Sequence, residues 1–376
     1  MTVSAPDTLD LSGLRGSHLP LPCESLPPML DFFVGRLGWR IDAIFPADSP
    51  NQAILSGHGL TLALFVGEGP RPEMIRMLCE DPDAVAGGQR ELVAPNGVKV
   101  RFVHAVPPMV LPPTRQALVF SRMDTEGGKG WTVGRAGLRY RDLLPDRHGG
   151  AFIASHIRIL EGGPVPDYVH YHKVRFQMIF CRKGWVRVAY EGQGEPLVMH
   201  AGDCVLQPPE IRHRVLESSA GCEVVELASP AQHITIADHD LLLPSAPLPP
   251  GHDFHGQRFV FSEMKHAAWA PWRVPGFEVR DTGIGAATFG LAGARVVRAT
   301  GTAPARRQTQ RGSELVFYFV LQGRLTITVN GHAHALAADD SVTLPEGMPF
   351  ALTPSADLEM LEVTLPEHPA SESEPA

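Results

Sequence analysis

The feature that most constrains this chain is a set of three histidines in two segments rich in alternating apolar and polar residues. The first segment, GPVPDYVHYHKVRFQMIFCRKG, carries His170 and His172 two residues apart. Residues i and i+2 of a strand project from the same face, so both imidazoles can point to one side of a sheet. The second segment, GDCVLQPPEIRH, ends on His213. Because neutral imidazoles are good ligands for first-row divalent metals, the pattern predicts a metal site within a β structure.

The glycines and prolines around these histidines resemble the two halves of the cupin signature. In sequence order the matching positions are Gly163, His170, His172, Gln177, Gly184, Gly202, Pro208 and His213. The resemblance implies a double-stranded β-helix (jelly-roll) barrel that holds a metal through His170, His172, His213 and the residue at 177. The family has Glu where this chain has Gln177, so two arrangements stay open. Gln177 is either a fourth ligand or a hydrogen-bonding group beside three histidine ligands.

Three residues near the expected metal are candidates for catalysis. Gln177 would tune the metal by ligation or by a hydrogen bond. Arg175 offers the planar fork that matches a carboxylate. Tyr168 precedes the histidine pair by two residues and is expected near the barrel mouth. The last two would orient a substrate.

A second copy of the barrel pattern follows, without the histidines. The run SELVFYFVLQGRLTITVNGHAHALAADDSVTLPEGMPFAL repeats the strand and turn pattern of the first barrel. Alignment places Thr309, Arg311, Val316 and Phe350 where the first barrel has His170, His172, Gln177 and His213. His332 and His334 follow a hairpin turn at the wrong point of the motif and are rejected as a site. The resemblance is therefore to a bicupin with one metal-binding barrel and one degenerate barrel.

The N-terminal part has a different pattern. Met29, Phe32, Phe33 and Leu37 recur at helical spacing, which predicts an amphipathic helix that ends at Gly38. The strand-like runs WRIDAIFP, NQAILSG and LTLALFVG follow. This β-α-β-β-β order resembles the vicinal-oxygen-chelate (glyoxalase-like) module. The family's metal-binding Glu is replaced by a cation, Arg101, so a domain without metal is expected.

Chain length and the positions of prolines and glycines suggest how the chain is divided into domains. Its 376 residues exceed one ordinary core, and 35 prolines and 37 glycines suit many short strands joined by turns. We therefore expect a mostly β chain in which two cupin barrels follow an α+β glyoxalase-like βαβββ domain. The proline-rich stretches near 105–114 and 241–253 mark the linkers. The expected parts are a disordered tail at 1–16, the glyoxalase-like domain at 17–125, cupin barrel 1 at 135–242, cupin barrel 2 at 254–366 and a disordered tail at 367–376.

These features predict a metal-dependent enzyme. A net charge of −8 without a basic cluster argues against a nucleic-acid partner. No run is apolar enough to span a bilayer, no secretory signal is visible, and five scattered cysteines suit a reduced cytoplasm. The resemblance implies a dioxygenase acting on a small anionic chelating molecule such as an organic acid, phenol or diketone. Fe(II) is favoured, and Ni, Mn, Co, Cu and Zn are left open. A non-redox lyase or isomerase and a non-catalytic metal- or small-molecule-binding bicupin are the alternatives, and a homodimer is expected.

Overall fold

The computed structural model describes residues 15–46, 49–123, 130–134, 137–301 and 306–375, without side chains at 306–307 and 371–375. The chain divides into two compact units, Met1–Pro108 and Met109–Ala376. Almost all of the tail expected at 1–16 lies outside the described residues. None of the helices in the described ranges has the length and apolar character needed to cross a membrane.

The first unit contains the predicted β-α-β-β-β order. Its four-stranded sheet runs β1-β4-β3-β2, with β1 parallel to β4. The helical segment packs Met29, Phe32 and Phe33 into the core, and Gly38 follows it with a positive φ of 71°. A three-stranded sheet, β5-β7-β6, completes the unit. The order of elements is confirmed, whereas the glyoxalase-like family stays a prediction. The elements are β1 (Leu19–Cys23), α1 (Leu26–Leu30), η1 (Asp31–Arg36), β2 (Arg40–Phe45), β3 (Gln52–Gly57), β4 (Leu60–Val66), β5 (Met74–Cys79), η2 (Ala86–Gly88), β6 (Glu91–Val93) and β7 (Lys99–His104).

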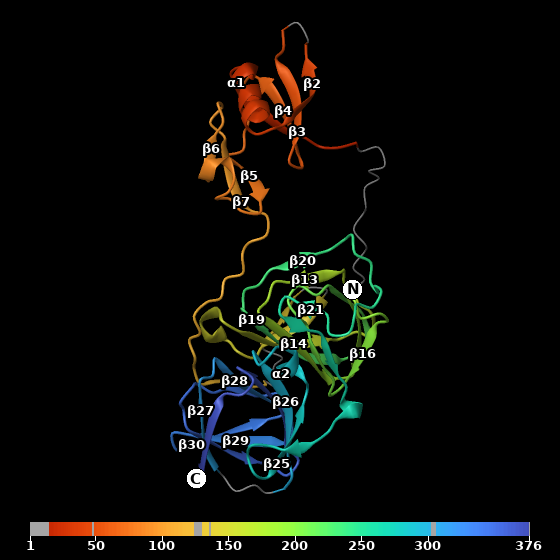
Figure 1. Ribbon diagram of the computed structural model, residues 1–376, viewed down its shortest axis with the longest axis vertical. Helices are drawn as coiled ribbons and strands as arrows, with labels where there is room; N and C mark the ends of the chain where they lie inside the picture. The colour runs from red at the N-terminus through yellow and green to blue at the C-terminus, as the bar shows by residue number, and fades with distance from the viewer. Residues whose placement is uncertain (1–14, 47–48, 124–129, 135–136, 302–305, 376) are drawn as a thin grey trace. The chain divides into compact units, whose positions relative to one another are not determined.

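Barrel 1 of the second unit is formed by two facing sheets. The sheet orders are β23-β17-β14-β19-β11-β10-β9 and β16-β15-β18-β13-β20, with β12 paired to β18. Figure 1 shows most of these strands in yellow and green. The elements are β9 (Trp131–Val133), β10 (Arg139–Asp142), η4 (Arg147–Gly150), β11 (Ile153–Ile159), β12 (Gly163–Pro164), β13 (His170–His172), β14 (Phe176–Lys183), β15 (Trp185–Tyr190), β16 (Leu197–His200), β17 (Cys204–Leu206), β18 (His213–Ser218), β19 (Cys222–Ser229), β20 (Thr235–Ala237) and β23 (Val260–Ser262).

Barrel 2 repeats the plan, and apart from β8 its strands are drawn in teal to blue in Figure 1. Its sheets run β24-β25-β26-β33-β28-β31-β8 and β30-β29-β32-β27-β34. The elements are β8 (Val119–Ser121), β24 (Ala270–Pro271), β25 (Phe277–Asp281), α2 (Ile284–Ala287), β26 (Gly293–Ala299), β27 (Arg306–Arg311), β28 (Leu315–Gln322), β29 (Arg324–Val329), β30 (His332–Ala337), β31 (Ser341–Thr343), β32 (Phe350–Pro354), β33 (Glu359–Leu365) and β34 (Ala370–Pro375). The hairpin β21 (Asp253–Phe254) and β22 (Gln257–Arg258) and the short η5 (Met264–His266) lie between the barrels in sequence.

One hydrophobic core joins the two barrels. Alternation along β14 sends Phe176, Met178 and Phe180 into this shared core. From barrel 2, Phe317 and Phe319 enter the same cluster. The opposite faces of β14 and β28 line the separate barrel interiors. The predicted two-sided alternation of β14 is therefore confirmed, and its outward face serves as the interface between barrels.

Each barrel also receives a strand from outside its own sequence segment. The strand β8 pairs with β31 of barrel 2, although it precedes barrel 1 in the chain. The strand β23, which lies within the segment 254–366 expected for barrel 2, pairs with β17 of barrel 1, so the expected boundary at residue 254 is wrong. The expected boundary at residue 125 is therefore wrong, because the first unit ends at Pro108. The prolines near 105–114 mark an extended segment, but sequence patterns do not show which sheet a distant strand joins.

The expected disordered tail at 367–376 is also wrong for its described part. Residues Ala370–Pro375 form β34, which pairs antiparallel with β27 from Arg306 to Arg311. The polar composition ASESEP suggested disorder. An edge strand, however, gains its hydrogen bonds from the neighbouring backbone and does not need apolar side chains.

Candidate metal centre

The three predicted ligands converge in barrel 1. His170 lies directly opposite His213 in the β13–β18 pair, and His172 shares the face of His170. The ring centroids of His170 and His213 are 4.3 Å apart, and that of His172 lies 5.1 and 5.2 Å from them. One nitrogen of each ring lies within 4.8 Å of the others, which suits a common metal ion. His170 and His213 are buried and His172 is half-buried.

Hydrogen bonds orient the rings for ligation. The Nδ1 of His170 donates to the carbonyl of Tyr168 at 2.8 Å, and that of His213 donates to the carbonyl of Ile211 at 3.0 Å. A carbonyl can only accept, so in the neutral rings the lone pair lies on Nε2. The Nδ1 of His172 lies 2.9 Å from the hydroxyl of Thr235. Backbone and hydroxyl partners of this kind fix the tautomer of metal-binding histidines, and the donor set therefore fits a divalent metal.

Gln177 lies beside the histidines and is engaged by a carboxylate. It is buried, and its Nε2 donates to Oε1 of Glu226 at 2.5 Å. Gln177, His172 and His213 line the same cavity. This hydrogen bond fixes the amide nitrogen toward Glu226 and leaves the amide oxygen as the atom able to face a metal. Both arrangements of Gln177, ligand or neighbour, are compatible with it.

Glu226 was not identified from the sequence. It lies on β19, opposite Ile179 of β14, within the apolar run CEVVELAS. Glu226 alternates with the apolar Cys222 and Val224 on the inward face of this strand, and an acidic residue at such a position is a usable signal. Tyr190 and Gln207 were also missed; the Nε2 of Gln207 donates to the hydroxyl of Tyr190 at 2.9 Å. Burial raises the pKa of Tyr190, so this hydroxyl stays protonated.

A small cavity begins at the histidines and a larger pocket adjoins it. The inner cavity has a volume of about 100 Å³. The outer pocket, about 750 Å³, has Ser155, His233 and Thr235 in its lining. Tyr140, His172 and Glu226 line both spaces, so they stand where the two meet.

Arg175 does not line these cavities, contrary to the expected substrate-orienting role. Its guanidinium donates two hydrogen bonds to Glu314 of barrel 2, at 2.6 and 2.9 Å. Those bonds raise the pKa of Arg175. Strand alternation would put Arg175 on the inward face of Gln177, but Arg175 precedes β14, and its side chain reaches Glu314 of the other barrel. Arg175 is therefore a contact between barrels.

Replacing Arg175 by alanine is expected to leave metal content unchanged. The loss of stability should be below about 1 kcal/mol, because both partners of this ion pair are partly exposed. Metal analysis and urea unfolding measure the two effects. Arg187→Ala, which removes a similarly exposed pair with Glu217, is the matched control. If Arg175→Ala lost its metal and Arg187→Ala kept it, Arg175 would be needed for metal binding.

Tyr168 contributes its backbone to the site. Its carbonyl holds His170, while its side chain is 43% exposed and its ring centroid lies 5.8 Å from that of His170. The side chain lines neither the inner cavity nor the outer pocket. The structure thus supports a role in positioning His170 and does not bring the phenol into the cavity.

Barrel 2 has lost the histidine set, but the expected alignment was shifted by one residue. Gln308 lies opposite Phe350, just as His170 lies opposite His213. Gln308 and Gln310, rather than Thr309 and Arg311, therefore occupy the positions of His170 and His172. The segment from Gln310 to Val316 is one residue longer than the segment from His172 to Gln177. That extra residue caused the error. Val316 and Phe350 stand where they were predicted.

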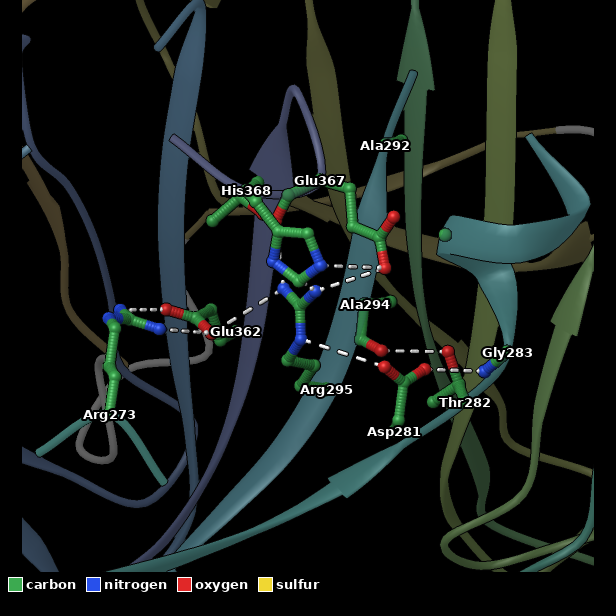
Figure 2. Close-up of polar contacts among 12 residues, drawn as sticks. Arg273, Asp281, Thr282, Gly283, Ala292, Ala294, Arg295, Glu362, Glu367 and His368 are labelled. Carbon is green, nitrogen blue, oxygen red and sulfur yellow. Dashed lines mark hydrogen bonds and ion pairs between the residues drawn. The ribbon is translucent and has the colours of Figure 1, made fainter. Parts of the chain in front are cut away.

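Barrel 2 has buried ion pairs where barrel 1 has its cavity. Glu362 of β33 is fully buried and accepts hydrogen bonds from both terminal nitrogens of Arg273 (Figure 2). Arg295 lies 4.0 Å from Glu362 and 3.2 Å from Glu367. Glu226 lies opposite Ile179 of β14, and Glu362 lies opposite Tyr318 of β28. Ile179 and Tyr318 occupy equivalent positions, so Glu362 in barrel 2 corresponds to Glu226 in barrel 1. Two arginines thus neutralise in barrel 2 the carboxylate position that lines the cavity in barrel 1.

A second cluster of ligand-type residues lies apart from the histidines. His156 donates from Nε2 to Glu223 at 2.7 Å, and Asp339 of barrel 2 lies close to both. Arg158 pairs with Glu223 at 3.0 Å, and Arg182 with Asp339 at 2.9 Å. These cations satisfy the carboxylates, so the cluster is a buried ion-pair network.

His156 is expected to make stability depend on pH. Burial lowers its pKa below the ordinary 6.5, more than the bond to Glu223 raises it. As pH falls through about 6.5 the unfolded chain therefore takes up a proton that the folded chain resists, and stability declines. His156→Gln should show a smaller loss of urea midpoint between pH 7.5 and 5.5 than the parent. Equal losses would assign the pH dependence to other groups.

The comparisons agree with this architecture. Residues 296–364, within barrel 2, match the cupin domain family. The fold is similar to that of salicylate 1,2-dioxygenase from Pseudaminobacter salicylatoxidans, with a TM-score of 0.55 and 14% identity over 71% of this chain and 91% of that chain. Its gentisate adduct has a TM-score of 0.53 and 14% identity over 71% and 87% of the two chains. At this identity the likeness shows the fold alone, and a search of curated proteins finds no match.

Proposed function

We propose that barrel 1 binds a divalent metal through His170, His172 and His213 and that the protein is a metal-dependent cupin dioxygenase. The observation that carries the proposal is the convergence of three oriented imidazoles beside a cavity. The fold of salicylate 1,2-dioxygenase supports the reaction class by analogy. The substrate would be a small chelating molecule, and O₂ would be the co-substrate.

The metal would supply Lewis acidity and, as Fe(II), the one-electron chemistry that O₂ requires. The chain supplies the rest. His170 and His213 are held by backbone carbonyls, and Gln177 is held by Glu226. The aliphatic part of the lining lowers the polarity around the reacting groups. Rigid ligands and a cavity of low polarity are what such catalysis needs from the protein.

Oxygen uptake tests this proposal. Protein loaded with Fe(II) under anaerobic conditions is mixed with a panel of phenols and diketones, and O₂ consumption is followed with an electrode. We expect consumption that depends on both iron and substrate and is absent from a His170→Ala/His213→Ala variant. Uptake equal in parent and variant, or none with any chelating substrate despite bound iron, would contradict the dioxygenase.

Glu226 favours a second candidate, a non-redox lyase or isomerase. A carboxylate that lines the cavity beside the ligands can accept a proton from a chelated carbonyl compound. In that case the zinc-loaded protein would convert substrate without O₂. Product formation in an anaerobic vessel separates this candidate from the dioxygenase.

A further inference from the structure

The inner cavity of barrel 1 has a polar part beside the histidines and an aliphatic part away from them. At its polar end Gln177 bonds to Glu226, and the Tyr190 ring lies 5.7 Å from that of His213. Tyr140 and Gln207 also line the cavity. Apart from the histidines, the other lining residues are aliphatic, and they include Leu138, Ile157, Ile179, Val186, Met199 and Val224.

The described lining provides no positive charge. None of the residues described around this cavity is Lys or Arg, and the one carboxylate among them belongs to Glu226. A carboxylate buried there, away from the metal, would lack a partner and would be repelled by Glu226. The arginine expected to pair with such a group, Arg175, is bound to Glu314. The part of a ligand that enters the aliphatic region is therefore uncharged.

The volume sets the size of that part. The cavity measures about 100 Å³. A protein cavity of about 150 Å³ is known to hold benzene, a ring of six carbons. In proportion, the space here accepts about four carbons. A short aliphatic group fits, whereas an aromatic ring requires a larger cavity.

We infer that the molecule bound in barrel 1 combines a chelating head at the three histidines with an uncharged aliphatic body of about four carbons. The inference rests on the proposed metal site and narrows its substrate class. Among organic acids, phenols and diketones, it selects aliphatic diketone-like chelators. A second carboxylate or an aromatic ring is excluded from the inner cavity, and a ligand that carries one would have to place it in the outer pocket.

Three hydroxamates with one chelating head test the inference on the zinc-loaded protein, in which no redox turnover occurs. Pentanohydroxamic acid has a butyl body, succinic monohydroxamate ends in a carboxylate, and benzohydroxamic acid carries a ring. Affinities are measured by calorimetry after zinc content has been confirmed. We expect the butyl compound to bind at least tenfold more tightly than either of the others.

A change of cavity size provides an independent readout. Met199 is buried in the aliphatic lining, and Met199→Ala should shift the preference toward benzohydroxamic acid by about tenfold. Met109→Ala, a partly exposed methionine outside this lining, should leave the ratio unchanged. Equal binding of the charged and butyl compounds, or a ratio that Met199→Ala does not alter, would overturn the inference even if zinc is bound. Failure to hold any metal would instead overturn the proposed function.

Discussion

The double variant His170→Ala/His213→Ala is expected to purify without the metal that the parent carries. The two imidazoles stand opposite each other on β13 and β18, and their removal leaves His172 as the one remaining histidine of the set. His172, even with Gln177 beside it as a second neutral ligand, does not retain a first-row metal through purification. Plasma mass spectrometry on protein prepared without added metal or chelator measures the metal-to-protein ratio. We expect a ratio near one for the parent and near zero for the variant.

The chain offers a matched control for this experiment. His332 and His334 form a second His-x-His pair on β30, and the ring of His334 stacks on Phe120 at 4.5 Å. His332→Ala/His334→Ala should keep the full metal content. Equal metal in all three proteins would mean that barrel 1 does not hold the ion. The identity of the metal then chooses the assay, since iron points to O₂ chemistry and zinc to proton transfer.

Glu362→Ala is expected to destabilise the second unit by about 3–5 kcal/mol. The carboxylate is fully buried, and its loss would leave Arg273 and the buried Arg295 without their shared partner. Uncompensated buried charge is the costliest consequence of breaking such a pair. Urea unfolding followed by fluorescence measures the change. The exposed pair of Glu278 and Arg298 gives the control, and Glu278→Ala should cost less than about 1 kcal/mol.

The stability that Glu362 contributes is expected to depend on pH. Burial raises the pKa of Glu362, but the charges and hydrogen bonds of Arg273, with Arg295, outweigh burial and hold the pKa below the ordinary 4.5. A lowered pKa means that the contribution to stability is present above about pH 4.5 and is lost as pH falls toward the folded value. Unfolding curves from pH 6 to 3 should therefore converge for parent and Glu362→Ala. Curves that stay parallel would contradict the ion-pair account.

The local patterns of the sequence were sufficient for several features. The i, i+2 spacing of His170 and His172 put both rings on one face, and His213 was recognised from the turn residues before it. Alternation along β14 assigned Gln177 inward and Phe176 outward. These features depend on strand geometry within a few residues, which the order of side chains specifies directly.

Other features depended on contacts between distant segments. The exchange of β8 and β23 between barrels moved the domain boundary, and β34 formed from a polar tail because an edge of barrel 2 was open to it. Glu226 entered the site because β19 pairs with β14, and Arg175 left it because Glu314 of barrel 2 binds its guanidinium.

The sequence by itself therefore determined the strands of barrel 1 that carry the site, their inward faces and the three histidines. The tertiary structure decided which sheet each edge strand joined, which charged groups were paired, and what size and polarity of cavity lies beside the three histidines. The physical reason is that periodicity is a local property of the chain. Pairing of edges, neutralisation of charges and enclosed volume arise from segments that are far apart in the sequence, as between Arg175 and Glu314.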